Sequence, residues 1–182
     1  VPGCEAVSSA QDVSDRASLV FITTNDSAIE GVCADVKWRA GQTVAHCSGA
    51  ATADVLARAR DDGAAVAAFH PITTFAGFDD PSPAFAGVTF GADGDGPALA
   101  LLGEVAAALG GRLVRVNPEL KALYHAGGVF ACNYLITLLA IGERLMTEAG
   151  LEPAVAGNAL RLMMRRTLQN AERLGTASAL SG

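Results

Sequence analysis

The sequence predicts an α/β protein in which a parallel sheet is followed by an all-helical segment. Three short apolar runs, residues 18–22, 43–45 and 65–69, predict strands, and each run ends in polar residues or histidine. Strands that are buried on both faces of a parallel sheet read as continuous apolar runs. Helical patterns lie between these runs, at residues 27–36 and 52–61, so we expect parallel strands joined by crossover helices.

Two further strands are predicted at residues 87–91 and 112–116. Between them, the glycines of residues 91–96 predict a tight turn, and Asp95 or Gly96 can cap the helix that follows. A calcium loop is the weaker alternative for this turn, because proline and alanine stand where such a loop needs a ligand and a glycine.

The rest of the chain predicts two long helices. Residues 117–119, Asn-Pro-Glu, form a strong helix start, with Asn as the cap and Pro in the first turn. Only glycines interrupt the pattern before Gly150, which predicts a helix of about 30 residues and roughly 45 Å. Residues 152–174 predict the second helix. We therefore expect a sheet domain over residues 1–116 and a helical domain over residues 117–182.

Composition excludes several classes of protein. The net charge is −6, and binding to nucleic acid requires clustered Lys and Arg, so no nucleic-acid partner is expected. The longest strongly apolar run, residues 134–141, is shorter than the about 20 residues of a membrane-spanning helix, and no charged-then-apolar leader opens the chain. The four cysteines form no C-x-x-C pair, so free thiols are expected and a metal site is not. The expected location is cytoplasmic, without a membrane partner.

Polar residues collect at the ends of the three predicted strands. In open α/β sheets, ligands bind outside the carboxyl ends of the strands. One edge of the sheet is therefore expected to carry a binding site built from Thr23, Thr24, Asn25, Asp26, Ser48, Gly49 and His70.

The long helix adds two polar residues to an apolar setting. His125 and Asn133 fall on one face at helical spacing, where each must find a partner. A hydrogen-bonded core histidine and amide explain this spacing as well as a functional site does. The presence of His70 at a strand end favours a site between sheet and helix. His46, inside a strand, is interpreted as a packing residue.

Four strings of residues resemble one bacterial family. They are VFITTNDSAI at 20–29, HCSGA at 46–50, FHPITTF at 69–75 and LKALYHAGGVFACNY at 120–134. This family combines a Rossmann-like domain with a helical C-terminal domain of unknown function, within the 6-phosphogluconate dehydrogenase-like superfamily. The resemblance covers nearly the whole chain and implies a partial Rossmann-like sheet and a dinucleotide-dependent oxidoreductase that uses NAD or NADP.

The chain departs from the family pattern in two ways. The Gly-rich strand and turn that hold the pyrophosphate would precede Val1, so the chain is expected to be a fragment of a longer protein, with a truncated C-terminal domain and without activity of its own. Several dehydrogenases of the superfamily also carry a catalytic lysine four residues before the helix Asn. Val129 occupies that position here, which disfavours a lysine-based mechanism.

A more distant resemblance to prephenate and arogenate dehydrogenases accounts for the histidines. These enzymes carry a Ser after one strand, a His-Pro after the next and a His early in the dimerising helix, and Ser48, His70 and His125 occupy similar places. Oxidation of an alcohol needs a base of near-neutral pKa, which either histidine supplies. By the same resemblance, Ser48 and Asn133 would orient the substrate or the nicotinamide. The turn from Thr23 to Asp26 would lie along the nicotinamide ribose.

These observations lead to two hypotheses of different class. The first is an NAD(P)-dependent oxidoreductase that transfers a hydride to or from a small hydroxy or keto acid or a related metabolite. The second is a catalytically inactive Rossmann-derived module for binding or regulation. In both, the apolar surface of residues 123–145 exceeds what one sheet face can cover, so we expect a homodimer through the C-terminal helices.

Overall fold

A computed structural model describes residues 3–75 and 85–179 of the chain. Its contacts divide the chain into two compact units, Val1–Gly127 and Gly128–Gly182. We call them the α/β unit and the helical unit and describe each by itself. The first unit extends past the expected domain boundary at residue 116 because the start of the long helix contacts the sheet.

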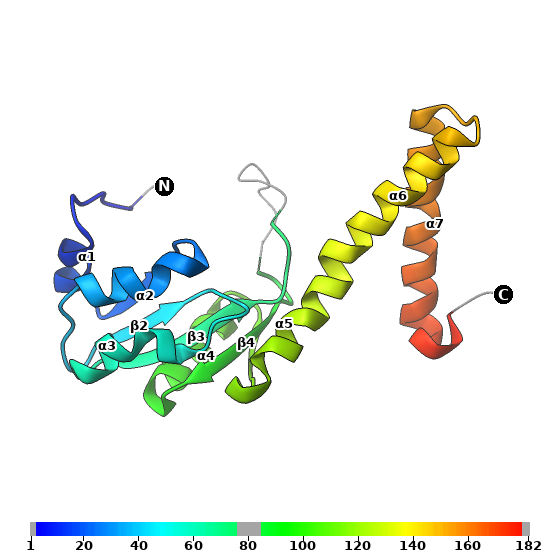
Figure 1. The fold of residues 1–182 in the computed structure, drawn as a ribbon. Helices are drawn as coiled ribbons and strands as arrows, with labels where there is room; N and C mark the ends of the chain where they lie inside the picture. The colour runs from blue at the N-terminus through cyan, green and yellow to red at the C-terminus, as the bar shows by residue number, and fades with distance from the viewer. Residues whose placement is uncertain (1–2, 76–84, 180–182) are drawn as a thin grey trace. The chain divides into compact units, whose positions relative to one another are not determined.

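The α/β unit contains a five-stranded sheet with the order β1-β2-β3-β4-β5 (Figure 1). The pairs β1-β2, β2-β3 and β4-β5 are parallel, and β3-β4 is antiparallel. The strands are β1 Leu19–Ile22, β2 Thr43–His46, β3 Ala65–Pro71, β4 Thr89–Gly94 and β5 Arg112–Arg115. The α/β class and the partial Rossmann-like sheet predicted from the sequence are confirmed.

One local prediction is wrong. Residues 91–94 belong to β4 and pair with β3, so they do not form the tight turn expected from their glycines. The chain turns one residue later, at Asp95, which occupies the expected N-cap position of α4 without a side-chain cap hydrogen bond. The strand pairing supplies backbone hydrogen bonds that outweigh the poor strand propensity of glycine.

Helices cover both faces of the sheet (Figure 1). On one face, α2, η1 and α3 bury a cluster around Ile29, Leu56 and Val66. On the other face, α4 packs against Phe69 and Phe90. The helical segments of this unit are α1 Ala10–Arg16, α2 Asp26–Asp35, η1 Ala53–Leu56, α3 Ala57–Asp61, α4 Gly96–Ala108, η2 Pro118–Leu120 and α5 Lys121–Val129, whose last two residues belong to the helical unit.

The strand register places the polar residues of the sheet on the face that α2 and α3 cover. His46 of β2 lies opposite Ala68 of β3, and Ala68 lies opposite Asp93 of β4. Two residues further along, His70 lies opposite Gly91. Because successive side chains of a strand alternate between faces, all of these residues share one face of the sheet.

The helical unit is a hairpin of two long helices. A π-helical segment, Phe130–Tyr134, continues α5 into α6, Leu135–Glu148, and α7, Pro153–Leu174, follows, with a short η4 at Thr176–Ser178. Gly142 brings α6 close to α7, since a Cβ there would lie 3.2 Å from Leu160 Cδ1. The Arg161 guanidinium donates to the Glu143 carboxylate at 2.7 Å. Both predicted long helices are present.

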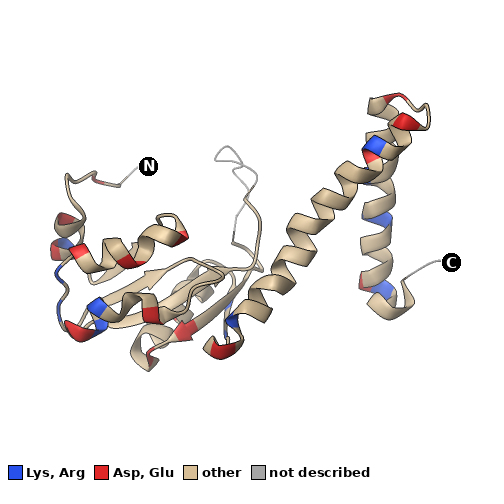
Figure 2. Cartoon of the chain, in the orientation of Figure 1, with Lys and Arg blue, Asp and Glu red and all other residues tan. Residues whose placement is uncertain are grey.

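The long helix is apolar over most of its length. No residue between Lys121 and Glu143 is Asp, Glu, Lys or Arg (Figure 2). The span Pro118–Glu148 has 31 residues and is long and apolar enough to cross a membrane by length and composition alone. This corrects the expectation drawn from residues 134–141, which counted only the most apolar part of the helix. A single helix of this kind is weak evidence for a membrane segment.

Candidate active site

The ends of the first three strands form one edge of the sheet, where most of the predicted site residues lie. Thr23, Thr24 and Asn25 follow β1 in an exposed turn, and Asn25 caps α2 without a side-chain hydrogen bond. Asp26, the first residue of α2, accepts a hydrogen bond from the Ser48 hydroxyl at 2.6 Å. This bond joins the turn after β1 to the turn after β2.

Ser48 holds the turn after β2 together. Its hydroxyl donates to Asp26 and accepts hydrogen bonds from the backbone N–H groups of Ala50 at 3.2 Å and Ala51 at 3.0 Å. A hydroxyl has one donor and two acceptor positions, and all three are used here. Ser48 is also buried. In this arrangement it positions the turn, and its predicted contact with substrate stays a prediction.

His46 also organises this turn. It is fully buried, as its interpretation as a packing residue requires. Its Nδ1 accepts from the Ser48 backbone N–H at 3.1 Å, so Nε2 carries the proton and donates to the Thr52 carbonyl at 3.0 Å. Burial lowers the pKa of His46, which keeps the ring neutral and both bonds in place.

The structure brings His70 and His125 together over Gly49. The centroids of the two imidazole rings are 6.5 Å apart. A Cβ on Gly49 would lie 2.7 Å from His125 Nδ1 and 2.9 Å from His70 Nε2, closer than a side chain tolerates. Gly49 is therefore required for the two rings to approach the strand end. Both nitrogens reach the edge that carries the exposed turn after β1.

The environment of His70 favours its neutral form. Burial lowers its pKa first, and the nearby charges of His125 and Lys121 lower it further, while Asp26 opposes them. His125, in contrast, is exposed on α5. The site therefore combines one half-buried imidazole that stays neutral with one imidazole that solvent reaches, an arrangement suited to proton transfer near neutral pH.

Sequence reasoning missed three residues that lie beside this pair. Lys121 and Asp93 form an ion pair with only 2% and 5% of their side chains exposed. Asp93 also accepts from the Ala53 backbone N–H at 2.7 Å. Tyr124 lies with its hydroxyl oxygen 2.7 Å from His70 Nδ1. The sequence does contain a signal that could have identified Lys121 and Tyr124. Their helical spacing with His125 puts all three residues on one face of α5.

Asn133 lies in the other unit. It is exposed within the π-helical segment of the helical unit, so its predicted role beside the substrate stays a prediction. Among residues 3–75 and 85–179, no group of three or more His, Cys, Asp and Glu residues could hold a metal ion.

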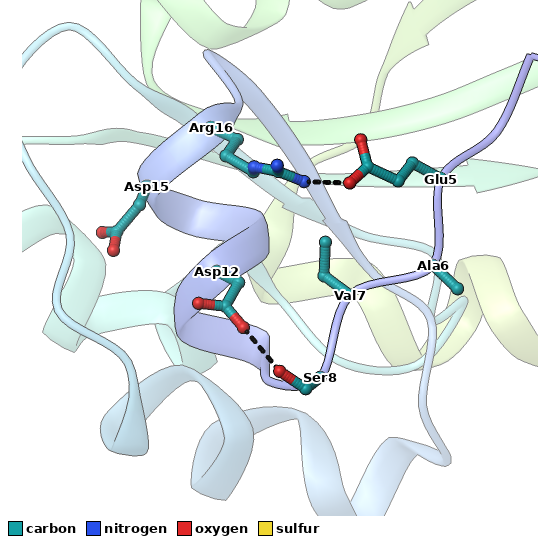
Figure 3. Close-up of a pocket in the computed structure, with 7 residues that line it drawn as sticks. All are labelled: Glu5, Ala6, Val7, Ser8, Asp12, Asp15 and Arg16. Atoms are coloured by element: carbon teal, nitrogen blue, oxygen red, sulfur yellow. Dashed lines mark hydrogen bonds and ion pairs between the residues drawn. The ribbon is translucent and has the colours of Figure 1, made fainter.

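A separate hollow lies beside α1, away from these residues in the sequence (Figure 3). Its charged and polar groups already pair with one another, since Arg16 contacts Glu5 at 2.9 Å and the Ser8 hydroxyl donates to Asp12 at 3.1 Å. Arg16 and Glu5 are exposed, so neither needs a ligand to satisfy it.

Comparison with protein families decides the classification of the chain. The domain of unknown function DUF2520 matches residues 88–182, which is more than half of the chain, and a Rossmann-like domain matches residues 1–71. The chain belongs to the DUF2520 family. The resemblance noted from its sequence strings is thereby confirmed. No curated protein matches the chain in sequence.

Solved structures share the fold of this DUF2520 protein. Protein TM1727 from Thermotoga maritima is 23% identical, with a TM-score of 0.76 over 91% of this chain and 63% of that one. BF3122 from Bacteroides fragilis, a proposed NADP oxidoreductase, is 19% identical, with a TM-score of 0.72 over 91% and 62%. The pyrroline carboxylate reductase of Plasmodium falciparum, solved with NADP bound, is 8% identical, with a TM-score of 0.64 over 94% and 66%.

These comparisons establish the fold of NAD(P)-dependent reductases for the DUF2520 chain. At such identities they show the fold alone and leave the activity and the substrate open. The chain spans 63% and 62% of the first two structures.

Proposed function

We propose that this DUF2520 protein is an NAD(P)-dependent oxidoreductase that transfers a hydride to or from a small hydroxy or keto acid or a related metabolite. The observation that carries the proposal is the approach of His70 and His125 over Gly49, at the edge of the sheet where α/β proteins bind their ligands. The fold, which it shares with a reductase solved with NADP, supports the same conclusion.

The histidines would manage the proton that accompanies the hydride. Reduction of a carbonyl places an electron pair on its oxygen, which then takes a proton, and oxidation of an alcohol requires the reverse. A neutral imidazole can hydrogen-bond to that oxygen, and an imidazolium can protonate it. His70 and His125 present Nε2 and Nδ1 to the same position above Gly49.

The residues at the strand ends fit the nicotinamide end of the cofactor. Thr23, Thr24 and Asn25 are exposed and offer hydroxyl and amide groups to ribose and carboxamide. Asp26 places a carboxylate at the first turn of α2, where it would repel a phosphate but can accept hydrogen bonds from ribose hydroxyls. When bound, the nicotinamide ring would supply or accept the hydride.

A fluorescence titration and a single-turnover assay test the proposal. The full-length protein is titrated with NADH and NADPH and then screened against small keto and hydroxy acids. His70→Asn should leave cofactor affinity nearly unchanged and slow the hydride step by about 10²- to 10⁴-fold. Cofactor binding without turnover of any substrate would favour the inactive binding module. An unimpaired His70→Asn enzyme would show that the site is misassigned.

We also propose that the protein forms a homodimer through its C-terminal helices. The helical unit exposes large apolar side chains on most sides, and patches of this kind usually mark interfaces. Leu138→Glu should shift the protein from dimer to monomer in sedimentation, and monomer alone for the unaltered protein at tens of micromolar would contradict the proposal. The exposed large apolar side chains of the helical unit are Phe130, Tyr134, Ile136, Leu138, Ile141, Leu145, Leu151, Val155, Leu162, Met163, Leu168 and Leu174.

A further inference from the structure

Tyr124 is the nearest polar partner of His70. Its hydroxyl oxygen lies 2.7 Å from His70 Nδ1, and the two rings meet edge to face at 86°, with centroids 5.7 Å apart. The bond connects residues 54 positions apart in the sequence. It occupies the imidazole nitrogen that faces away from Gly49, so it bears directly on how His70 presents Nε2 to the site.

Gly91 makes room for this contact. It lies opposite His70 in the antiparallel pair, so both residues face α5 from the same side of the sheet. A Cβ on Gly91 would collide with the Tyr124 hydroxyl and lie 2.5 Å from its Cζ. Any side chain at position 91 would therefore push the phenol away from His70.

The buried ion pair fixes the helix that carries Tyr124. Asp93 and Gly91 are two residues apart on β4 and share a face, and Lys121 and Tyr124 are three residues apart on α5 and share a face. Lys121 binds Asp93, and Tyr124 lies against Gly91. This two-point contact sets both the position and the rotation of the helix that also carries His125.

The direction of the Tyr124 hydrogen bond follows from its surroundings. Burial raises the pKa of Tyr124, so the phenol keeps its proton. The phenol hydrogen then needs an acceptor, and His70 Nδ1 is within reach.

We propose that Tyr124 is a positioning residue that donates to His70 Nδ1 and holds His70 as the neutral tautomer protonated at Nε2. His70 then serves as a hydrogen-bond donor to the substrate oxygen, and His125 is the residue that exchanges the proton. In carbonyl reduction, the hydride bonds to carbon, the C=O π pair moves to oxygen, and that oxygen takes a proton from the His125 imidazolium, which solvent restores. This assignment rests on the proposed function and gives the two histidines different roles in the proposed reaction.

The charged and titratable groups near His70 are consistent with this division. From α5 it faces Tyr124, His125 and Lys121, and from α2 it faces Asp26. The charge of Lys121 is held by Asp93, and the carboxylate of Asp26 accepts from Ser48. Tyr124 is thus the group that bonds directly to the His70 ring, while the others act on it through their charges.

Nitrogen NMR of the imidazole rings tests the tautomer without any substrate. The chain has only three histidines, so single His→Gln variants assign their signals. In the unaltered protein at neutral pH, His70 Nε2 should resonate as a protonated nitrogen and Nδ1 as an unprotonated acceptor. Tyr124→Phe should mix the tautomers and raise the pKa of His70 towards its usual value, because the bond to the neutral form is lost. Tyr134→Phe, at the other tyrosine, should change neither.

Gly91→Ala gives an independent check, because it displaces the phenol and should reproduce the spectrum of Tyr124→Phe. A proton found on His70 Nδ1, or a His70 spectrum and pKa that Tyr124→Phe leaves unchanged, would overturn the inference. The Nε2-protonated tautomer in a protein without turnover would refute the proposed function and leave the role of Tyr124 in positioning His70 intact.

Discussion

The two units of this chain differ in what their apolar residues contact. In the α/β unit, large side chains such as Ile29, Leu56, Phe90 and Leu102 are almost fully buried. In the described part of the helical unit, the buried residues are Ala156, Gly157 and Leu160. A sheet with helices on both faces encloses its own core, whereas a hairpin of two helices buries only the stripe where they meet.

Their charged groups differ in the same way. Lys121 and Asp93 are an ion pair removed from water, while Arg144 and Glu148 in α6 are 72% and 67% exposed. Charges that are buried must stay paired, and charges in water need not. The comparison teaches that the candidate active site was built where the fold holds polar groups rigidly. The helical unit instead leaves most of its large apolar side chains exposed.

Breaking the buried ion pair should produce the largest contrast between the units. Lys121→Met leaves the Asp93 carboxylate buried without its cation and should lower the free energy of unfolding by about 3–5 kcal/mol. Arg144→Met removes one partner of the exposed pair and should cost less than about 1 kcal/mol. Urea unfolding followed by circular dichroism measures both. Similar losses for the two variants would contradict the difference in burial.

Truncating one leucine in each unit sharpens the comparison of their cores. Leu102→Ala leaves a cavity between α4 and the sheet and should cost about 2–5 kcal/mol. Leu138→Ala, at an exposed position of α6, should change the free energy of unfolding by less than about 0.5 kcal/mol at concentrations where the protein is monomeric. If Leu138→Ala were as costly as Leu102→Ala in the monomer, α6 would be covered by this same chain.

Acid should destabilise the α/β unit alone, with the smallest effect of the three. All histidines of the chain lie in that unit, and burial lowers the pKa of His46 and His70 below the usual 6.5. Between the lowered pKa and 6.5, the unfolded chain binds protons that the folded chain does not, so this stability is complete above pH 6.5 and is lost as the pH falls. Unfolding monitored by the single Trp, Trp38, between pH 7.5 and 5 measures the slope. His70→Asn should reduce this slope of stability against pH. An unchanged slope would show that His70 does not contribute to it.

The sequence alone determined the local elements and which strand ends lie at one edge of the sheet. Continuous apolar runs marked the first three strands, and Asp95 and Asn117 marked the helix starts that the structure contains. These signals are local, because periodicity, capping and glycine placement act within a few residues. The strand-end argument also predicted that His70 and Gly49 share one edge of the sheet, and the structure places them side by side.

Only the tertiary structure decided the partners of those residues. The antiparallel pairing of β4, the burial of Lys121 against Asp93 and the bond from Tyr124 to His70 join residues that are distant in the sequence. No periodicity encodes such pairs, because each depends on the register of β4 and on the rotation of α5 about its axis. The register of β4 and the rotation of α5 depend on many side chains that pack and pair simultaneously. Both are therefore defined only when the whole α/β unit has folded.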